Sequence, residues 1–108
     1  MKLDQTGGQL DVLMLAALAR GPVHGYGVIT RMRQDSGGVF AMPEGTIYPA
    51  LHRLEDAGLV SSLDEFAGGK RRRVYALTDA GVARLEVRRA EWTAFSTVVS
   101  RMIGVQPA

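Results

Sequence analysis

Apolar residues recur along the first part of the chain with the spacing of amphipathic helices. The first set lies three and four positions apart, which places its members on one helical face: Leu10, Leu13, Met14, Ala17 and Leu18. Gly21-Pro22 ends this pattern, so a first helix is predicted over about residues 9–20. A second helix is predicted over about residues 24–35, before Ser36-Gly37-Gly38.

The second predicted helix has two glycines near its start, Gly25 and Gly27. Each costs about 1 kcal/mol against alanine inside a helix. Glycine at such positions indicates that another backbone, or a phosphate, comes close. Tyr26 stands between them, either with its hydroxyl on a phosphate or half-buried against the next helix.

A third helix is predicted from Ile47, Leu51 and Leu54, which lie four and three positions apart. Its start has two solutions. If Thr46 is the N-cap, Pro49 falls in the first turn, where its missing N–H costs nothing. If the helix starts at Pro43, a distortion near Gly45 follows. Gly58 ends the helix.

Two short strands are predicted next, over residues 59–63 and 72–77. The connection between them contains Gly68-Gly69, which is typical of a β-hairpin turn. Four consecutive cations, Lys70 to Arg73, lie at the tip and on the return strand. A helix with polar side chains followed by a basic hairpin is typical of a winged helix-turn-helix that binds DNA.

The last predicted helix runs over about residues 79–103, with Thr78 as its N-cap. Leu85, Trp92 and Val99 are seven positions apart, as in a coiled-coil core. A second series contains Phe95 and Met102 and is interrupted at Arg88. Since a small domain cannot cover so long an apolar stripe, a second copy of the chain is predicted to cover it.

Length and composition fit this organisation. The chain has 108 residues, of which 46% are hydrophobic and 22% charged, as in a globular domain. We expect a mainly α fold with a small β-hairpin (α+β), divided into a winged helix-turn-helix domain (1–78) and a dimerisation helix (79–108). The formal net charge is only +2, so the basic character is local.

Several classes of protein are disfavoured. The chain has no cysteine, which removes disulfides and thiolate metal sites. It has no apolar run of the roughly 20 residues that a membrane span needs, and residues 1–8 lack the apolar core of a signal peptide. We therefore expect a soluble cytoplasmic protein without contact to a membrane.

Catalysis finds no support in the motifs, and neither an enzyme nor a cofactor is predicted. Gly25-Tyr26-Gly27 lacks the third glycine and the preceding strand of a dinucleotide fingerprint. The two histidines, His24 and His52, do not have the spacing of a preformed metal site, so no metal site is predicted. Glu55 and Asp56 end the third helix and are expected to face solvent.

The candidate DNA-binding residues come from the second and third helices and from the hairpin. Lysine and arginine neutralise phosphate, arginine can bind guanine edges, and hydroxyl and imidazole groups can donate to either. The predicted set is Tyr26, Thr46, Tyr48, His52, Arg53, Lys70, Arg71, Arg72 and Arg73. The alternatives are ordinary exposed residues, a solvated basic turn and, for Tyr48, a place in the core.

A candidate effector site is centred on Trp92, the single tryptophan, on the predicted dimer helix. Trp92 is either a core residue or the surface on which a flat ligand stacks between paired helices. The other residues proposed for this site are Leu13, Met14, Phe95 and Val99.

Three motifs in order give the chain a family resemblance. They are His24-Gly25-Tyr26-Gly27, the run from Glu44-Gly45-Thr46-Ile47-Tyr48-Pro49 through Leu54-Glu55 to Gly58-Leu59, and Gly69-Lys70-Arg71-Arg72-Arg73-Val74-Tyr75-Ala76-Leu77-Thr78 with Gly81. Together they resemble the PadR family of bacterial transcriptional regulators over about residues 9–103. Ile47 stands where leucine is usual, without chemical consequence.

The resemblance implies a winged-helix homodimer that represses transcription from a palindromic operator on double-stranded DNA. The chain is similar to the smaller subgroup of this family, in which one C-terminal helix forms the dimer with the same helix of a second copy. The resemblance implies DNA contacts for Tyr26, Thr46, Tyr48 and the hairpin cations. Trp92 falls near the position where multidrug-sensing relatives stack a tryptophan on planar drugs.

The function predicted from the sequence is therefore a DNA-binding transcriptional repressor, released by a small-molecule effector such as a planar aromatic compound or, less favoured, by a divalent metal ion. The alternative is a winged helix that binds another protein and no specific DNA, because a fold does not determine its function.

Overall fold

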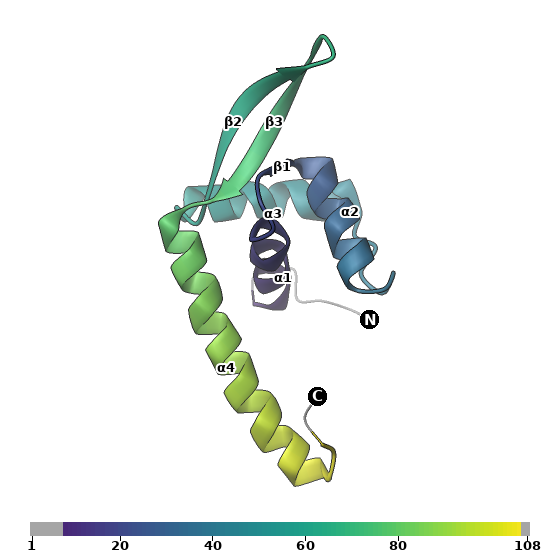
Figure 1. Cartoon of the computed structure of the whole chain (residues 1–108), viewed down its shortest axis with the longest axis vertical. Helices are drawn as coiled ribbons and strands as arrows, with labels where there is room; N and C mark the ends of the chain where they lie inside the picture. The colour runs from purple at the N-terminus through teal and green to yellow at the C-terminus, as the bar shows by residue number, and fades with distance from the viewer. Residues whose placement is uncertain (1–7, 107–108) are drawn as a thin grey trace.

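The computed structural model describes residues 8–106, and within this range it forms four helices and a three-stranded antiparallel sheet (Figure 1). The order is α1 (Gln9–Leu18), β1 (Val23–His24), α2 (Gly25–Asp35), α3 (Glu44–Asp56), β2 (Val60–Ala67), β3 (Lys70–Leu77) and α4 (Asp79–Ile103). The predicted fold class, mainly helical with a hairpin and a long last helix, is confirmed. The outer ends of the two predicted domains, 1–7 and 107–108, lie outside the described residues.

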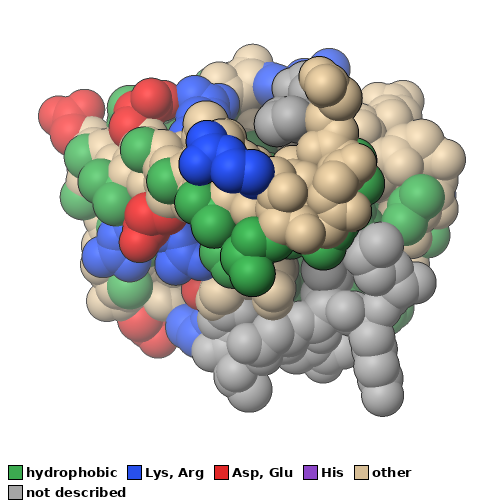
Figure 2. Space-filling model, turned by 90° about the horizontal axis from the view of Figure 1, so that it is seen from below, with side chains coloured by type: hydrophobic (Ala, Val, Ile, Leu, Met, Phe, Trp, Pro, Cys, Tyr) green, Lys and Arg blue, Asp and Glu red, His purple; other side chains and the backbone are tan. Residues whose placement is uncertain are grey.

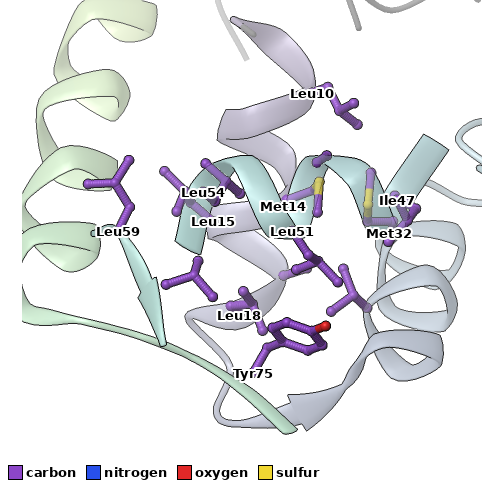
Figure 3. Close-up of a cluster of buried hydrophobic side chains, with 14 of the residues drawn as sticks. Leu10, Met14, Leu15, Leu18, Met32, Ile47, Leu51, Leu54, Leu59 and Tyr75 are labelled. Atoms are coloured by element: carbon purple, nitrogen blue, oxygen red, sulfur yellow. The ribbon is translucent and has the colours of Figure 1, made fainter. Parts of the chain in front are cut away.

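The core lies where α1, α2 and α3 turn their apolar faces toward one another (Figure 3). Met14 and Leu15 of α1, Leu51 of α3 and Tyr75 of β3 are buried there. α2 and α3 contribute the faces that their three- and four-residue spacing predicts, whereas α1 also buries Leu15, which was not in the predicted set, and leaves Leu13 half-buried. α1 ends at Leu18, two residues earlier than predicted.

The start of α3 follows the second of the two predicted solutions. The helix begins at Glu44 with Pro43 as N-cap, because the N–H groups of Thr46 and Ile47 both donate to the Pro43 carbonyl at 3.0 and 3.1 Å. Pro49 therefore lies inside the helix, where it cannot donate to the carbonyl four residues earlier. The helix nevertheless continues through it to Asp56.

The end of α3 is a Schellman motif. The Leu59 N–H donates to the Leu54 carbonyl and the Gly58 N–H donates to the Glu55 carbonyl, each at 3.0 Å. Gly58 has a φ of 76°, which glycine adopts without the strain of a side chain. This turn directs the chain from α3 into β2.

The hairpin of β2 and β3, here called the wing, is longer than predicted. Its strands pair from Val60 opposite Leu77 to Ala67 opposite Lys70. Gly68 and Gly69 have φ values of 58° and 77°, which a type I′ turn requires, and such a turn keeps the strands paired up to it. Of the predicted connection, residues 64–67 and 70–71 belong to the strands, and only Gly68-Gly69 form the turn. Opposite charges across the strands, such as Glu65 facing Arg72, support pairing in this region.

Strand β1 was not predicted. Val23 pairs with Tyr75 and His24 with Val74, so β3 becomes the central strand of the sheet. Two residues are too short to give a period in the sequence. His24 then caps α2, because its Nδ1 accepts a hydrogen bond from the Gly27 N–H at 3.0 Å.

Helix α4 has the predicted bounds and the predicted N-cap. The Thr78 hydroxyl accepts from the Gly81 N–H at 3.1 Å and donates to the Gly58 carbonyl at 2.7 Å. A Cβ on Gly81 would lie 2.1 Å from the Leu59 carbonyl oxygen, so only glycine allows this close approach. Thr78 and Gly81 thus join the base of the wing, the end of α3 and the start of α4.

Beyond Leu85, α4 extends away from the helical core (Figure 1). Its side chains Trp92, Phe95 and Met102 are 64%, 62% and 80% exposed. Figure 2, seen from the end where α4 terminates, shows hydrophobic side chains at the surface beside charged ones. No helix among residues 8–106 is both long and apolar enough to cross a membrane.

Candidate nucleic-acid interface

An open cleft lies where the return strand of the wing meets the first turn of α2 and the middle of α3. Its volume is about 450 Å³, and it is lined by His24, Gly25, Tyr26, Tyr48, Arg71, Arg72 and Arg73. Five of these are predicted DNA-binding residues, from three separate segments of the sequence. The lining contains three arginines and no carboxylate, so the electrostatics of the cleft favour an anion.

The glycines on either side of Tyr26 make room for neighbouring side chains. A Cβ on Gly25 would lie 2.5 Å from Cε1 of Tyr48, so the absent side chain leaves room for the Tyr48 ring. Gly27 likewise leaves room for Val23, whose Cγ2 would be 2.1 Å from a Cβ there. The close approach expected at these glycines is therefore made by side chains within the protein. Tyr48 is half-buried by this packing, whereas Tyr26 is exposed.

The four wing cations are in different electrostatic environments. Arg71 pairs with Asp64 at 3.2 Å, and Arg73 lies 3.5 Å from Asp64 and 3.8 Å from Glu55. Lys70 and Arg72 are exposed and have no carboxylate within 4.0 Å in the described part of the chain. Two of the four charges are thus available to an external anion without breaking an ion pair.

The remaining predicted residues on α3 lie outside the cleft. Thr46 is half-buried and His52 is exposed. Arg53 is directed toward α1, and its Nη2 lies 2.5 Å from Oδ1 of Asp11. This ion pair ties α3 to α1, and the Arg53 Nε is buried without a hydrogen-bond partner.

The prediction for Glu55 was wrong. Glu55 was expected to face solvent at the helix end, but it is half-buried, accepts a hydrogen bond from the Ser62 hydroxyl and faces Arg73. Asp56, its neighbour, is exposed. The difference arises because the turn after Gly58 brings β2 back beside α3. No short motif in the sequence indicates that contact.

Tyr75 lies behind Arg73 in the core and is almost completely buried. Burial raises the pKa of its hydroxyl above the ordinary value of about 10, because the charged form would lose its hydration. The positive charge of Arg73 opposes this rise in pKa.

Within one copy of the chain, the five predicted effector residues are divided between α1, with Leu13 and Met14, and α4, with Trp92, Phe95 and Val99. Trp92 and Phe95 are neighbours on α4, with ring centroids 6.1 Å apart and planes tilted by 41°. Met14, by contrast, is fully buried in the core, so a ligand cannot reach it without opening the core (Figure 3). Among residues 8–106, no three His, Cys, Asp or Glu side chains lie together as a metal site requires.

Comparison with known proteins gives a consistent result. The family model described as "Transcriptional regulator PadR-like family" matches residues 14–87. Transcriptional regulator Rv3488 of Mycobacterium tuberculosis is 50% identical over 52 residues, which are 47% of this chain and 49% of that protein. The first three curated relatives are covered over 21%, 49% and 39% of their length, so the chain spans at most about half of each.

Solved structures match more completely. A PadR family transcription regulator from Clostridium difficile is 30% identical with a TM-score of 0.79, covering 89% of this chain and 99% of that one. Bacillus subtilis PadR in complex with operator DNA is 28% identical with a TM-score of 0.65, covering 71% of this chain and 44% of that one.

Proposed function

The chain belongs to the PadR-like family of transcriptional regulators, and on that premise we propose that it is a homodimeric repressor that binds a palindromic operator and releases it when an effector binds. The family is one of transcriptional regulators and not of enzymes. The solved complex of a relative with operator DNA supports a duplex as the partner. In this proposal, residues 1–78 bind DNA and residues 79–108 form the dimer.

The cleft is the observation that carries the proposal. It joins Tyr26 and Tyr48 to the wing arginines around one concave, cationic surface. The exposed side of α3 enters the major groove, with Thr46 and His52 toward base edges or phosphate. Lys70, Arg71 and Arg72 neutralise phosphates beside that groove. The hydroxyls of Tyr26 and Tyr48 donate to the DNA backbone, which fixes the register of α3.

Dimerisation through α4 is supported by its surface. Trp92, Phe95 and Met102 are large apolar side chains left exposed on one long helix. A second α4 packed along them would remove this apolar surface from water. Two copies of α3 related by a two-fold axis would then read half-sites about 34–36 Å apart, which is one turn of the duplex.

The effector proposal rests on the same helix. Trp92 and Phe95 present two adjacent aromatic rings, which suits a planar aromatic ligand held between paired helices. Such a ligand releases the operator only if it binds one spacing of the two α3 helices better than the other. A divalent metal ion is the less favoured effector, given the absence of a three-ligand cluster in residues 8–106.

The experiment that tests the function is an electrophoretic mobility shift on the DNA upstream of the chain's own gene, at two salt concentrations and with competitor DNA. We expect a discrete, competitor-resistant complex that weakens as salt rises, because each neutralised phosphate contributes about −0.9 to the slope of log K against log salt. Smeared and fully competed binding would contradict an operator at this position. Failure to bind any duplex at low salt would favour a protein partner instead.

The effector is tested separately, by fluorescence of Trp92 during titration with a panel of planar aromatic cations. We expect quenching by at least one compound and dissociation of the operator complex at the same concentration. Fluorescence that stays unchanged across the panel, together with an unaffected complex, would remove aromatic ligands from the proposal. Zn²⁺ in the same assay tests the metal alternative.

A further inference from the structure

We propose that Glu55 and Arg73 form a brace that holds the wing at a fixed angle to helix α3, and that Arg73 is a positioning residue and not a phosphate contact. This inference rests on the proposed function, because it concerns how the same chain selects an operator among other duplexes. It divides the run of four wing cations into residues that bind DNA and one that orients the wing.

The contacts of the brace span three elements. Glu55 belongs to the last turn of α3, Ser62 to β2 and Arg73 to β3. The Glu55 carboxylate accepts from the Ser62 hydroxyl and lies 3.8 Å from Nη2 of Arg73, whose Nη1 faces Asp64 at 3.5 Å. With 29% of its side chain exposed, Glu55 is partly shielded from solvent, so its attraction to Arg73 is screened less than that of a surface pair.

The backbone of the rest of the protein supports the wing only near its base. At its base, the wing is tied to the end of α3 by the Thr78 N–H on the Leu59 carbonyl and the Thr78 hydroxyl on the Gly58 carbonyl. β1 adds backbone pairing along the free edge of β3 at Tyr75 and Val74, and in the described residues this pairing does not continue beyond Val74 toward the tip. Figure 1 shows the rest of the hairpin extending from the helical core. The contacts of Ser62 and Arg73 with Glu55 lie farther out along the strands, where the same contact resists rotation with a longer arm.

The position of Arg73 on β3 agrees with this role. Tyr75 points into the core, and side chains two positions apart share a face of a strand, so Arg73 lies on the same face, toward α3. Arg72 lies on the opposite face and makes no ion pair with the described residues. A phosphate that binds Arg73 would have to compete with the two carboxylates that face it.

The Glu55→Gln substitution should affect DNA binding differently if Glu55 acts only through its charge than if it forms the brace. Removing a negative charge beside a polyanion should strengthen binding to every duplex. Loss of the brace should instead lower the preference for the operator, since α3 and the wing then no longer hold one geometry. Asp56→Asn is the matched control, because it removes the same charge from the next, exposed residue of the same helix.

The test is the ratio of operator affinity to affinity for a scrambled duplex, measured by fluorescence anisotropy at matched salt. We expect Glu55→Gln to lower this ratio about five- to tenfold, within the range of coupling between contacting residues, and Asp56→Asn to leave it unchanged. In an Arg73→Gln background, Glu55→Gln should have no further effect on the ratio, because the brace is already absent. Thermal unfolding of each variant verifies that the domain is folded.

Equal ratios for Glu55→Gln and Asp56→Asn would overturn the brace. A fall in the salt slope of about 0.9 per wing for Arg73→Gln, with an unchanged ratio, would also overturn it and make Arg73 a phosphate contact. If Glu55→Gln does not fold, Arg73→Gln alone still decides between the two, since its side chain is half exposed. Failure of the unsubstituted protein to distinguish the operator would refute the proposed function instead.

Discussion

Two arms leave the helical core of this molecule, and they differ in what they expose. The wing exposes arginine, lysine, aspartate and glutamate on its paired strands, with Leu63 and Phe66 as its large exposed apolar side chains, and its outer strand β2 is an edge of the sheet. Helix α4 exposes large apolar side chains over most of its length. The arms meet at Thr78 and diverge from there (Figure 1).

The difference indicates two kinds of partner. A hydrated cationic hairpin gains from a polyanion that releases counterions on binding. An exposed apolar helix gains from an apolar surface that removes it from water. The same short chain thus separates an electrostatic interface from a hydrophobic one, and the two should respond to different perturbations.

The largest effect is expected from Phe95→Asp on α4. A charge among the exposed apolar side chains should prevent the proposed dimer, because a buried unpaired carboxylate costs several kcal/mol. Since one half-site then binds alone, operator affinity should fall by about 100-fold or more. Light scattering gives the mass and anisotropy gives the affinity. Thr93→Asp adds the same charge two residues away and should keep the dimer. An intact dimer with Phe95→Asp would move the interface elsewhere.

A smaller but clear effect is expected from Gly81→Ala at the junction of the arms. The added Cβ would lie 2.1 Å from the Leu59 carbonyl oxygen, so the backbone must shift. We expect a loss of about 1–3 kcal/mol in the free energy of unfolding, as for overpacking of a core. Urea unfolding measures it. Gly45→Ala is the control, because it is helical and has no neighbour within 4 Å. Equal stability of the two variants would contradict a tight junction.

Arg72→Ala should weaken DNA binding by the wing without changing the proposed dimerisation through α4. Arg72 is exposed and makes no ion pair with the described residues, so its loss should weaken all duplexes alike. The slope of log K against log salt should fall by about 0.9 for each wing that binds DNA. Anisotropy titrations over a salt series measure it, and the mass of the dimer should not change. An unaltered slope would remove Arg72 from the interface.

The smallest effect is expected from pH, at Tyr75 beneath the wing. Burial raises the pKa of Tyr75 in the folded state above the unfolded value of about 10. Its contribution to stability is therefore fully present below pH 10 and is lost as pH rises through the folded-state pKa. Urea unfolding between pH 9 and 11 should reveal this decline, and Tyr75→Phe should reduce it. The same slope with and without the hydroxyl would assign the decline to other groups.

The fold was largely predictable because its signals are local. Helical spacing gave α1, α2 and α4, the latter with both bounds correct, and Gly68-Gly69 gave the hairpin. The features that were not predicted depend on contacts between residues far apart in the sequence. Strand β1 exists only through its pairing with β3, and the length of the wing depends on charges matched across strands. Neither of these features leaves a period in the sequence.

The candidate site was predictable in part for the same reason. Residue type and order identified the tyrosines and the wing cations that line the cleft. The ion pairs of individual cations could not be predicted from the sequence. Asp11 approaches Arg53, and Glu55 approaches Arg73, only in the folded chain. The spacing of Met14 to the other apolar residues of α1 could not separate a core residue from a ligand contact. The DNA and effector roles themselves remain predictions.

The junction at Gly81 also makes α4 a lever. Beyond the buried Leu85 the helix continues to Ile103, and at a rise of about 1.5 Å per residue this free part is about 27 Å long. A rotation of about 7° at Leu85 moves the far end by about 3 Å, which is comparable to the rise between neighbouring base pairs of a duplex. Conversely, a displacement of the far end of α4 requires only a small rotation of the helix relative to the end of α3 and the base of the wing.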